Sequence, residues 1–172
     1  MVLKTQRLTI RPVTADDWKS IKEIWIDFHN SAFSQYDRPH DTDDGAVRER
    51  ISKWAAANRG TEHMFFAICL NGTVIGYSAF NIRENGYEMG YCFHSAFHGK
   101  GYANESHLAL LDYMRKLGVT RLTAGTALQN EPSVTFLKAL GFSLTETEKV
   151  SFYKDEQGED VVFDGGIFAL LL

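Results

Sequence analysis

The chain has 172 residues, 44% of them hydrophobic, and its 18 basic and 22 acidic residues give a formal net charge of −4. These values predict one globular domain over residues 1 to 172, and the lack of a basic excess argues against a nucleic-acid partner. No apolar run approaches the roughly 20 residues of a membrane span, and the first residues lack the apolar core of a signal peptide, so we expect a cytoplasmic protein with no membrane partner.

The first third of the chain predicts one strand and two helices. Residues 8 to 11 form a short strand that Pro12 ends, and Thr14 can then cap a helix. Apolar residues at spacings of three and four give this helix one core-facing stripe, made of Trp18, Ile21, Trp25 and Phe28. Residues 29 to 42 are irregular, and a second helix is expected from 43 to 58.

The middle of the chain predicts three antiparallel strands. MFFAICL (residues 64 to 70) and TVIGYSAFNI (73 to 82) are joined by Asn-Gly, which is typical of a hairpin turn. YEMGYCFH (87 to 94) is the third strand. Cys69 and Cys92 lie in these apolar strands without C-x-x-C spacing, so we expect two buried free thiols.

The rest of the chain adds two helices and three strands. Helices are expected at 102 to 117 and 130 to 140, with a strand at 121 to 128 between them. Residues 143 to 172 predict a final hairpin. The order of these elements indicates a mixed α/β fold around a central antiparallel meander.

The segment FHSAFHGKGYANES, residues 93 to 106, joins the third strand of the meander to a helix. Free N–H groups at a helix N-terminus attract anions, and Gly99 and Gly101 let a phosphate approach the backbone closely. Lys100 adds a positive charge, so the segment predicts a phosphate site, with a plain glycine-rich connection as the alternative. A dinucleotide fingerprint fits poorly because Asn104 replaces its third glycine, and a P-loop lacks its Ser or Thr after the lysine.

Four segments, in this order, resemble the GNAT superfamily of acetyl-CoA-dependent N-acetyltransferases, and within it the ribosomal-protein N-terminal acetyltransferases. They are LKTQRLTIRPVTADDW (residues 3 to 18), YEMGYCF (87 to 93), HGKGYANE (98 to 105) and LQNEPSVTFLKALGF (128 to 142). The third departs from the family's Q/R-x-x-G-x-G/A signature only at His98. The resemblance covers nearly the whole chain and implies the acyl-CoA N-acyltransferase fold, a mostly antiparallel sheet with helices on both faces.

The resemblance also implies acetyl-CoA as cosubstrate, with its pantetheine arm along the central strand and its pyrophosphate on the loop N–H groups. The implied cofactor-binding residues are Tyr91, Cys92 and Phe93 in the strand, His98, Gly99, Lys100, Gly101, Tyr102, Ala103 and Asn104 in the loop, and Asn130 before the later helix. His98 replaces a family Gln or Arg, so one side-chain contact is in question. No histidine pair has metal-ligand spacing, and no metal is expected.

Glu88 is the candidate general base, since an attacking amine must lose a proton. By strand alternation it shares a face with Gly90 and Cys92, although a solvent-facing glutamate is the alternative. Some family members place a glutamate on the next strand, where this chain has Gly125.

Ser133 is the candidate acid. Many family members use a tyrosine at the place that Leu137 holds here, and the adjacent Phe136 has no proton to donate. A hydroxyl that only satisfies the helix N-terminus is the alternative for Ser133.

The expected activity is acetyl transfer to a primary amine, either a protein N-terminus or a small amine, by direct attack in a ternary complex. The protein is expected to act as a monomer or homodimer. Four rings in the irregular segment either shape the acceptor pocket or cover the core: His29, Phe33, Tyr36 and His40. A non-catalytic acyl-CoA-binding module is the alternative function, and a nucleotide-binding domain is a third hypothesis.

Overall fold

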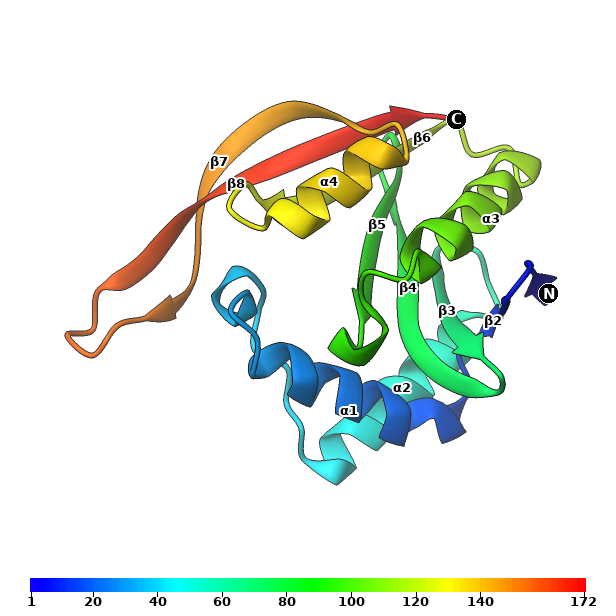
Figure 1. The fold of residues 1–172 in the computed structure, drawn as a ribbon, viewed down its shortest axis with the longest axis horizontal. Coiled ribbons are helices and arrows are strands. Elements are labelled where there is room, and N and C mark those ends of the chain that lie inside the picture. Colours follow the sequence, from blue (N-terminus) through cyan, green and yellow to red (C-terminus); the bar gives the residue numbers. More distant parts are fainter.

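The computed structural model describes residues 1–172 and contains one eight-stranded sheet in the order β1-β2-β3-β4-β5-β6-β8-β7 (Figure 1). All neighbouring strands are antiparallel except β5 and β6. The strands are β1 (Leu3–Lys4), β2 (Leu8–Pro12), β3 (His63–Leu70), β4 (Thr73–Arg83), β5 (Gly86–Phe93), β6 (Arg121–Ala127), β7 (Ser143–Lys154) and β8 (Asp160–Leu171). The helices are α1 (Trp18–His29), α2 (Asp44–Ala57), α3 (Tyr102–Lys116) and α4 (Glu131–Ala139), with 3-10 turns η1 (Ala15–Asp17), η2 (Ser34–Tyr36) and η3 (Ser95–Phe97).

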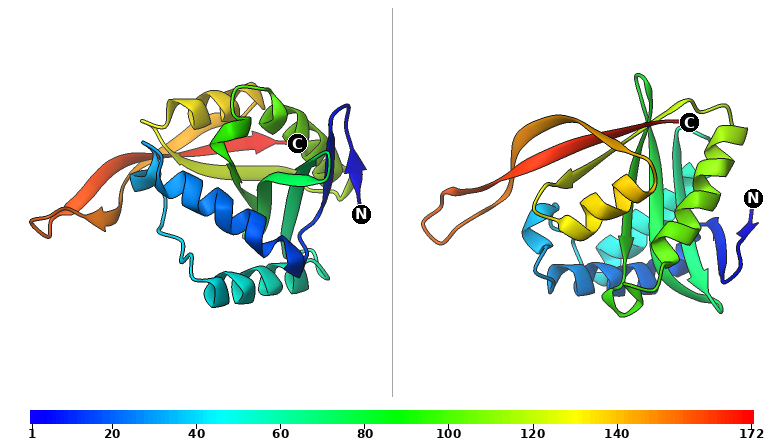
Figure 2. Two further views of the ribbon diagram at one scale, coloured as in Figure 1. Left: turned by 60° about the horizontal axis from the view of Figure 1, so that its bottom comes forward. Right: turned by 45° about the horizontal axis from the view of Figure 1, so that its top comes forward.

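Two hydrophobic cores lie on opposite faces of the sheet. Figure 2 shows α3 and α4 on one face and α1 and α2 on the other. The larger core lies under α3 and α4, and the smaller one lies under α1 and α2. Ile21 and Trp25 of α1 are fully buried, and each such side chain contributes roughly 1.5–3 kcal/mol of stability. The predicted mixed sheet with helices on both faces is therefore confirmed. In the predicted core-facing stripe of α1, Trp18 and Phe28 are only half-buried.

The chain enters its first helix differently from the expectation. Residues after Thr14 form the 3-10 turn η1 first, and α1 starts at Trp18. The Asp17 carboxylate accepts two hydrogen bonds of 2.7 Å from Arg11 and a third of 2.7 Å from the Thr14 N–H. This ion pair with β2 fixes the start of the helix, which a local capping pattern does not reveal.

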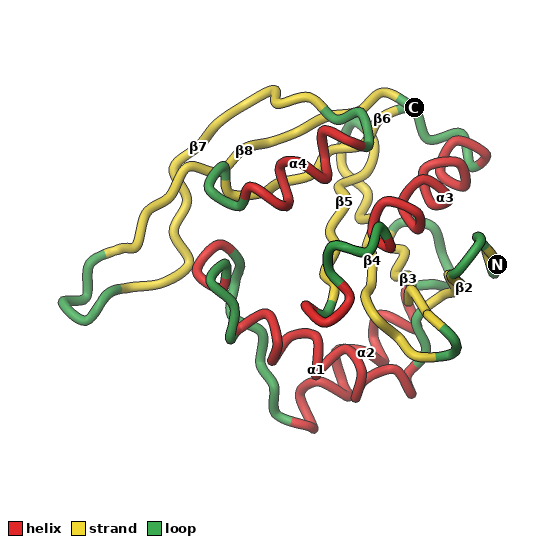
Figure 3. Tube along the Cα trace, in the orientation of Figure 1, coloured by secondary structure: helices red, strands yellow, loops and turns green.

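The parallel pairing between β5 and β6 is short and leaves much of β5 unpaired on that side. It joins only Tyr87 to Leu122 and Glu88 to Thr123, after which β5 continues alone to the glycine loop. The loop is visible as the connection from β5 to α3 in Figure 3. The second half of β5 therefore has a free edge between α3 and α4.

No helix combines the length and the apolar character needed to cross a membrane. Cys69 is buried and Cys92 half-buried, and both are free thiols. Burial raises the pKa of Cys92 to about 12, so this thiol stays protonated at neutral pH.

Candidate active site

The glycine loop presents a row of free backbone N–H groups. Gly99 (φ 69°) and Gly101 (φ 80°) adopt left-handed conformations that favour glycine, and Gly101 is the N-cap of α3 without any side-chain cap. None of the N–H groups from Gly99 to Asn104 donates a hydrogen bond within the protein. Because these donors lie at the positive end of α3, the backbone fits a pyrophosphate.

Two loop side chains that were expected at the phosphates contact the backbone instead. The Lys100 ammonium donates to the Ala96 carbonyl at 2.9 Å, and His98 Nε2 lies 2.8 Å from the Phe93 carbonyl. The backbone N–H groups of the loop are therefore its free hydrogen-bond donors, whereas the Lys100 ammonium is held by the Ala96 carbonyl.

Along the second half of β5, every second residue turns its backbone N–H and C=O toward the free edge. The His94 N–H donates to the Ile75 carbonyl of β4, so by alternation Cys92 also turns its N–H and C=O toward β4. Tyr91 and Phe93 turn theirs toward the side where β6 diverges. The resemblance implied three strand residues for the pantetheine arm. Tyr91 and Phe93 turn their backbone groups toward the free edge, where His98 Nε2 lies 2.8 Å from the Phe93 carbonyl, and Cys92 does not.

A pair of hydroxyl groups joins β5 to α4. The Tyr91 hydroxyl lies 2.6 Å from Ser133 Oγ, and the Tyr91 ring packs edge-on against Phe136 and His107 at 4.8 and 5.5 Å between centroids. Burial raises the pKa of Tyr91 to about 12, so the phenol is protonated at neutral pH. Ser133, predicted as the acid with a simple helix-end hydroxyl as the alternative, therefore has a specific hydroxyl partner on β5.

The Tyr91 hydroxyl was not predicted, because the sequence indicates only a backbone role for this residue. Strand alternation places Tyr91 on the face of Met89 and Phe93, but its distance from α4 depends on how the helix packs. Asn130 precedes that helix, and its Oδ1 accepts from the Ser133 N–H at 3.3 Å. The Asn130 side-chain amide thus fixes the start of α4 beside the free edge of β5.

Glu88 lies where the β5–β6 pairing ends, and Arg83 of β4 binds its carboxylate. Arg83 Nε donates to Glu88 Oε2 at 2.7 Å, and the Glu88 side chain is 44% exposed. The carboxylate is therefore reachable by water, which a proton-transfer role requires, but it is shared with a guanidinium.

Open space lies above the sheet on the side of α1 and α2. A Cβ atom built on Gly90 of β5 or on Gly125 of β6 would meet no atom within 4 Å. Each glycine lies two residues after the last β5–β6 pair, with Glu88 and Cys92 on the same face. This space can admit an acceptor amine to the free edge of β5.

The rings of the irregular segment from 29 to 42 contact two different parts of the protein, and its role in shaping an acceptor pocket stays a prediction. His40 stacks on Trp25 of α1 at 4.5 Å between ring centroids, so it covers the smaller core. Tyr36 instead packs against Phe163 of β8 at 5.2 Å, with Phe33 beside it. The Tyr36 contact connects this segment to the C-terminal hairpin on the side of the open space.

The fold and these groups define a class of protein, the acyl-CoA-dependent acyltransferases. Residues 7–143 match the family model described as acetyltransferase (GNAT) domain, and the chain belongs to this family of acetyltransferases. The chain is 30% identical over 176 residues to the uncharacterised N-acetyltransferase p20 of Bacillus licheniformis, which covers 98% of this chain and 95% of that protein.

Solved structures share the fold over the whole chain. A GNAT-family acetyltransferase from Bacillus anthracis superposes with a TM-score of 0.77 at 25% identity, covering 99% of this chain and 98% of that one. A ribosomal L7/L12 α-N-protein acetyltransferase solved in complex with coenzyme A has a TM-score of 0.84 at 16% identity, with 100% and 98% covered. At this low identity the second likeness describes the fold alone.

Proposed function

We propose that this GNAT acetyltransferase moves the acetyl group of acetyl-CoA to a primary amine in a ternary complex. The row of free N–H groups from residue 99 to 104, continuous with the free edge of β5, carries the proposal. These groups would hold the pyrophosphate and the pantetheine amides. Acetyl-CoA supplies the thioester, whose acetyl carbon is the electrophile.

The protein's own residues would handle the protons. Glu88 would take the proton that the attacking amine loses, directly or through one water molecule. As the new C–N bond forms and the C–S bond breaks, Ser133 would donate a proton to the departing sulfur. Tyr91 would return a proton to Ser133 across their 2.6 Å contact. Each group would be restored by exchange with water after the products leave.

The acceptor is proposed to be a protein N-terminus or a small amine. The first class is supported by the fold shared with a ribosomal L7/L12 α-N-protein acetyltransferase. The open space above Gly90 and Gly125 would receive either kind of amine.

The test measures thiol release from acetyl-CoA with a panel of short peptides that have free N-termini and a panel of small amines. Glu88→Gln is expected to lower kcat on the order of 100-fold, and Ser133→Ala to lower it as well, without changing the affinity for CoA. Glu84→Gln, an exposed acid in the adjacent turn, is the matched control and should keep full activity.

Two results would oppose this function in different ways. Acetyl-CoA binding without thiol release for any amine would favour the alternative, a non-catalytic acyl-CoA-binding module. Full activity of Glu88→Gln would mean that Glu88 is not the general base. The protein's own thiols should not disturb the assay, because Cys69 is buried and burial also raises the pKa of Cys92.

A further inference from the structure

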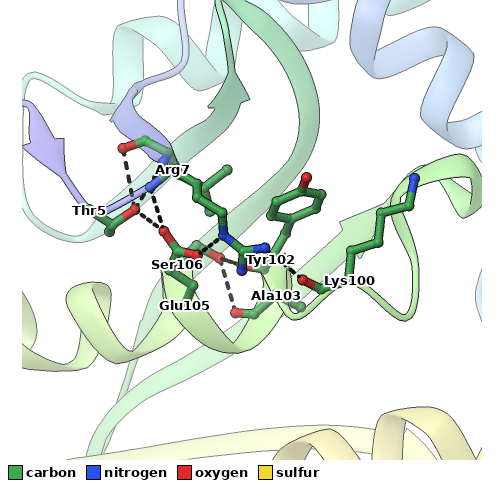
Figure 4. Close-up of polar contacts among 8 residues, drawn as sticks. Thr5, Arg7, Lys100, Tyr102, Ala103, Glu105 and Ser106 are labelled. Carbon is green, nitrogen blue, oxygen red and sulfur yellow. Dashed lines mark hydrogen bonds and ion pairs between the residues drawn. The ribbon is translucent and has the colours of Figure 1, made fainter.

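A polar cluster formed by the β1–β2 turn lies against the first turn of α3 (Figure 4). Glu105 of α3 accepts hydrogen bonds from the Thr5 hydroxyl at 2.5 Å and from the Arg7 N–H at 2.9 Å. Its second oxygen accepts from Arg7 Nε at 2.7 Å. Partial burial raises the pKa of Glu105, but the hydrogen bonds from Thr5 and Arg7 outweigh it and hold this pKa below its ordinary value. The carboxylate therefore stays ionised and fixes Arg7.

The fixed guanidinium reaches the glycine loop. Arg7 Nη1 donates to the Lys100 carbonyl at 3.0 Å, and the guanidinium carbon lies 4.5 Å from the centre of the Tyr102 ring. A Cβ atom on Gly101 would lie 3.4 Å from Arg7 Nη2, so the side chain passes close to the glycine. Figure 4 shows the Lys100 ammonium extending away from this contact while its carbonyl faces Arg7.

This contact determines the direction of one phosphate-binding N–H group. A trans peptide is planar, so the carbonyl of Lys100 and the N–H of Gly101 point in opposite directions. With the carbonyl held by Arg7, the N–H of Gly101 points away from Arg7, toward the side that the cluster leaves open. Gly101 has φ 80°, and a glycine at this position could rotate easily without such a contact.

Arg7 has an electrostatic role as well. Glu105 lies in the first turn of α3, where its negative charge would oppose a bound phosphate. The Arg7 guanidinium at 2.7 Å compensates that charge. Removing both Arg7 and Glu105 distinguishes these two roles. CoA affinity should stay low if Arg7 positions the loop, and should recover if Arg7 only compensates the charge of Glu105.

We propose that Arg7 is a positioning residue for the coenzyme A pyrophosphate and acts through the Lys100–Gly101 peptide. This inference rests on the proposed binding of acetyl-CoA at the loop. It assigns a role in donor binding to the opening segment of the chain, which lies 93 positions before Lys100 in the sequence.

The experiment compares the dissociation constants of CoA and of S-acetylpantetheine, which has no pyrophosphate, by calorimetry. Arg7→Ala is expected to weaken CoA binding about tenfold, because one charge-assisted hydrogen bond to the pyrophosphate would be misdirected. The dissociation constant of S-acetylpantetheine should stay unchanged. Arg7→Lys should show a similar loss, because one ammonium does not reproduce the planar contact with both the carboxylate and the carbonyl. Arg115→Ala, which breaks a 2.9 Å ion pair with Asp112 later on α3, is the control and should bind like the parent.

The double variant Arg7→Ala/Glu105→Gln separates the two roles. We expect it to bind CoA as weakly as Arg7→Ala does. Recovery of the parent affinity would mean that Arg7 only compensates charge, and the inference would be wrong. Equal loss for CoA and S-acetylpantetheine, or no loss for either, would overturn it as well. A parent protein that does not bind CoA would instead contradict the proposed function. Melting curves identify any variant that does not fold, and Arg7→Lys then replaces Arg7→Ala.

Discussion

His107 of α3 is fully buried between the loop and the sheet, beside the Tyr91–Ser133 pair. Its Nδ1 lies 2.8 Å from the Ala103 carbonyl, which can only accept, so Nδ1 carries the proton. Its Nε2 lies 3.2 Å from Ser78 Oγ, and the Ser78 hydroxyl donates to the Gly90 carbonyl at 3.2 Å. Burial lowers the pKa of His107 to about 4, against 6.5 for an ordinary histidine. The neutral imidazole therefore serves as a structural link between α3 and β4.

This imidazole predicts a loss of stability in mild acid. The unfolded chain binds a proton at His107 below pH 6.5, whereas the folded chain does so only below about pH 4. Stability is complete above pH 6.5 and falls as the pH is lowered through this window, by about 2 kcal/mol at pH 5. Urea unfolding at pH 7.5 and 5 should show this loss.

The His107→Gln variant is expected to lose about 2 kcal/mol less than the parent between these pH values, because the titrating group is gone. His63→Gln, at an exposed position on β3, is the control and should keep the parent's pH dependence. Identical pH dependence of the parent and His107→Gln would show that His107 is not the responsible group.

At the scale of elements, the divergence of β5 and β6 creates the space that Gly125 leaves open. Gly125→Leu is expected to melt within about 2 °C of the parent, since an exposed substitution away from strained backbone typically costs under 0.5 kcal/mol. The new side chain would occupy the proposed acceptor space, so kcat/KM for the amine should fall on the order of tenfold while the affinity for CoA stays unchanged. Steady-state kinetics and calorimetry measure the two effects.

A glycine in β4, which β5 separates from β6 in the sheet, provides the contrasting substitution. A Cβ on Gly76 of β4 would overlap the ring of Phe93, so Gly76→Ala should lower the melting temperature. Unchanged kinetics of Gly125→Leu would mean that the acceptor amine does not bind on this face of the sheet.

Local patterns predicted most elements well. The Asn71-Gly72 turn was recognised from its sequence, and Asn71 (φ 49°) and Gly72 (φ 85°) have the positive φ angles that a tight hairpin turn requires. The two-residue strand β1 was missed because two residues show no alternation, and only pairing with β2 defines it. The Arg7 contact with Lys100 joins distant segments, and no periodicity in either segment could indicate it.

At the scale of the whole molecule, the proposed donor groove combines segments from distant parts of the chain. The loop follows the meander, Ser133 comes from α4, and Arg7 comes from the β1–β2 turn. The β7–β8 hairpin extends beyond the helices in Figure 1, and Phe163 of β8 contacts Tyr36 at 5.2 Å between ring centroids. A ligand in this groove touches several elements at once and should stabilise the entire fold.

This coupling predicts a thermal shift that is specific for coenzyme A. A ligand present at 100 times its dissociation constant adds about 2.7 kcal/mol, which raises the melting temperature of a domain of this size by roughly 5–10 °C. CoA and acetyl-CoA should give this shift, whereas NAD and ATP should not, because neither has a pantetheine arm to pair with the edge of β5. A shift with ATP equal to that with CoA would mean that the loop recognises phosphate alone and that β5 contributes no binding. No shift with any of the four would mean that the free N–H groups of the loop do not bind a pyrophosphate, and the donor assignment would then be wrong.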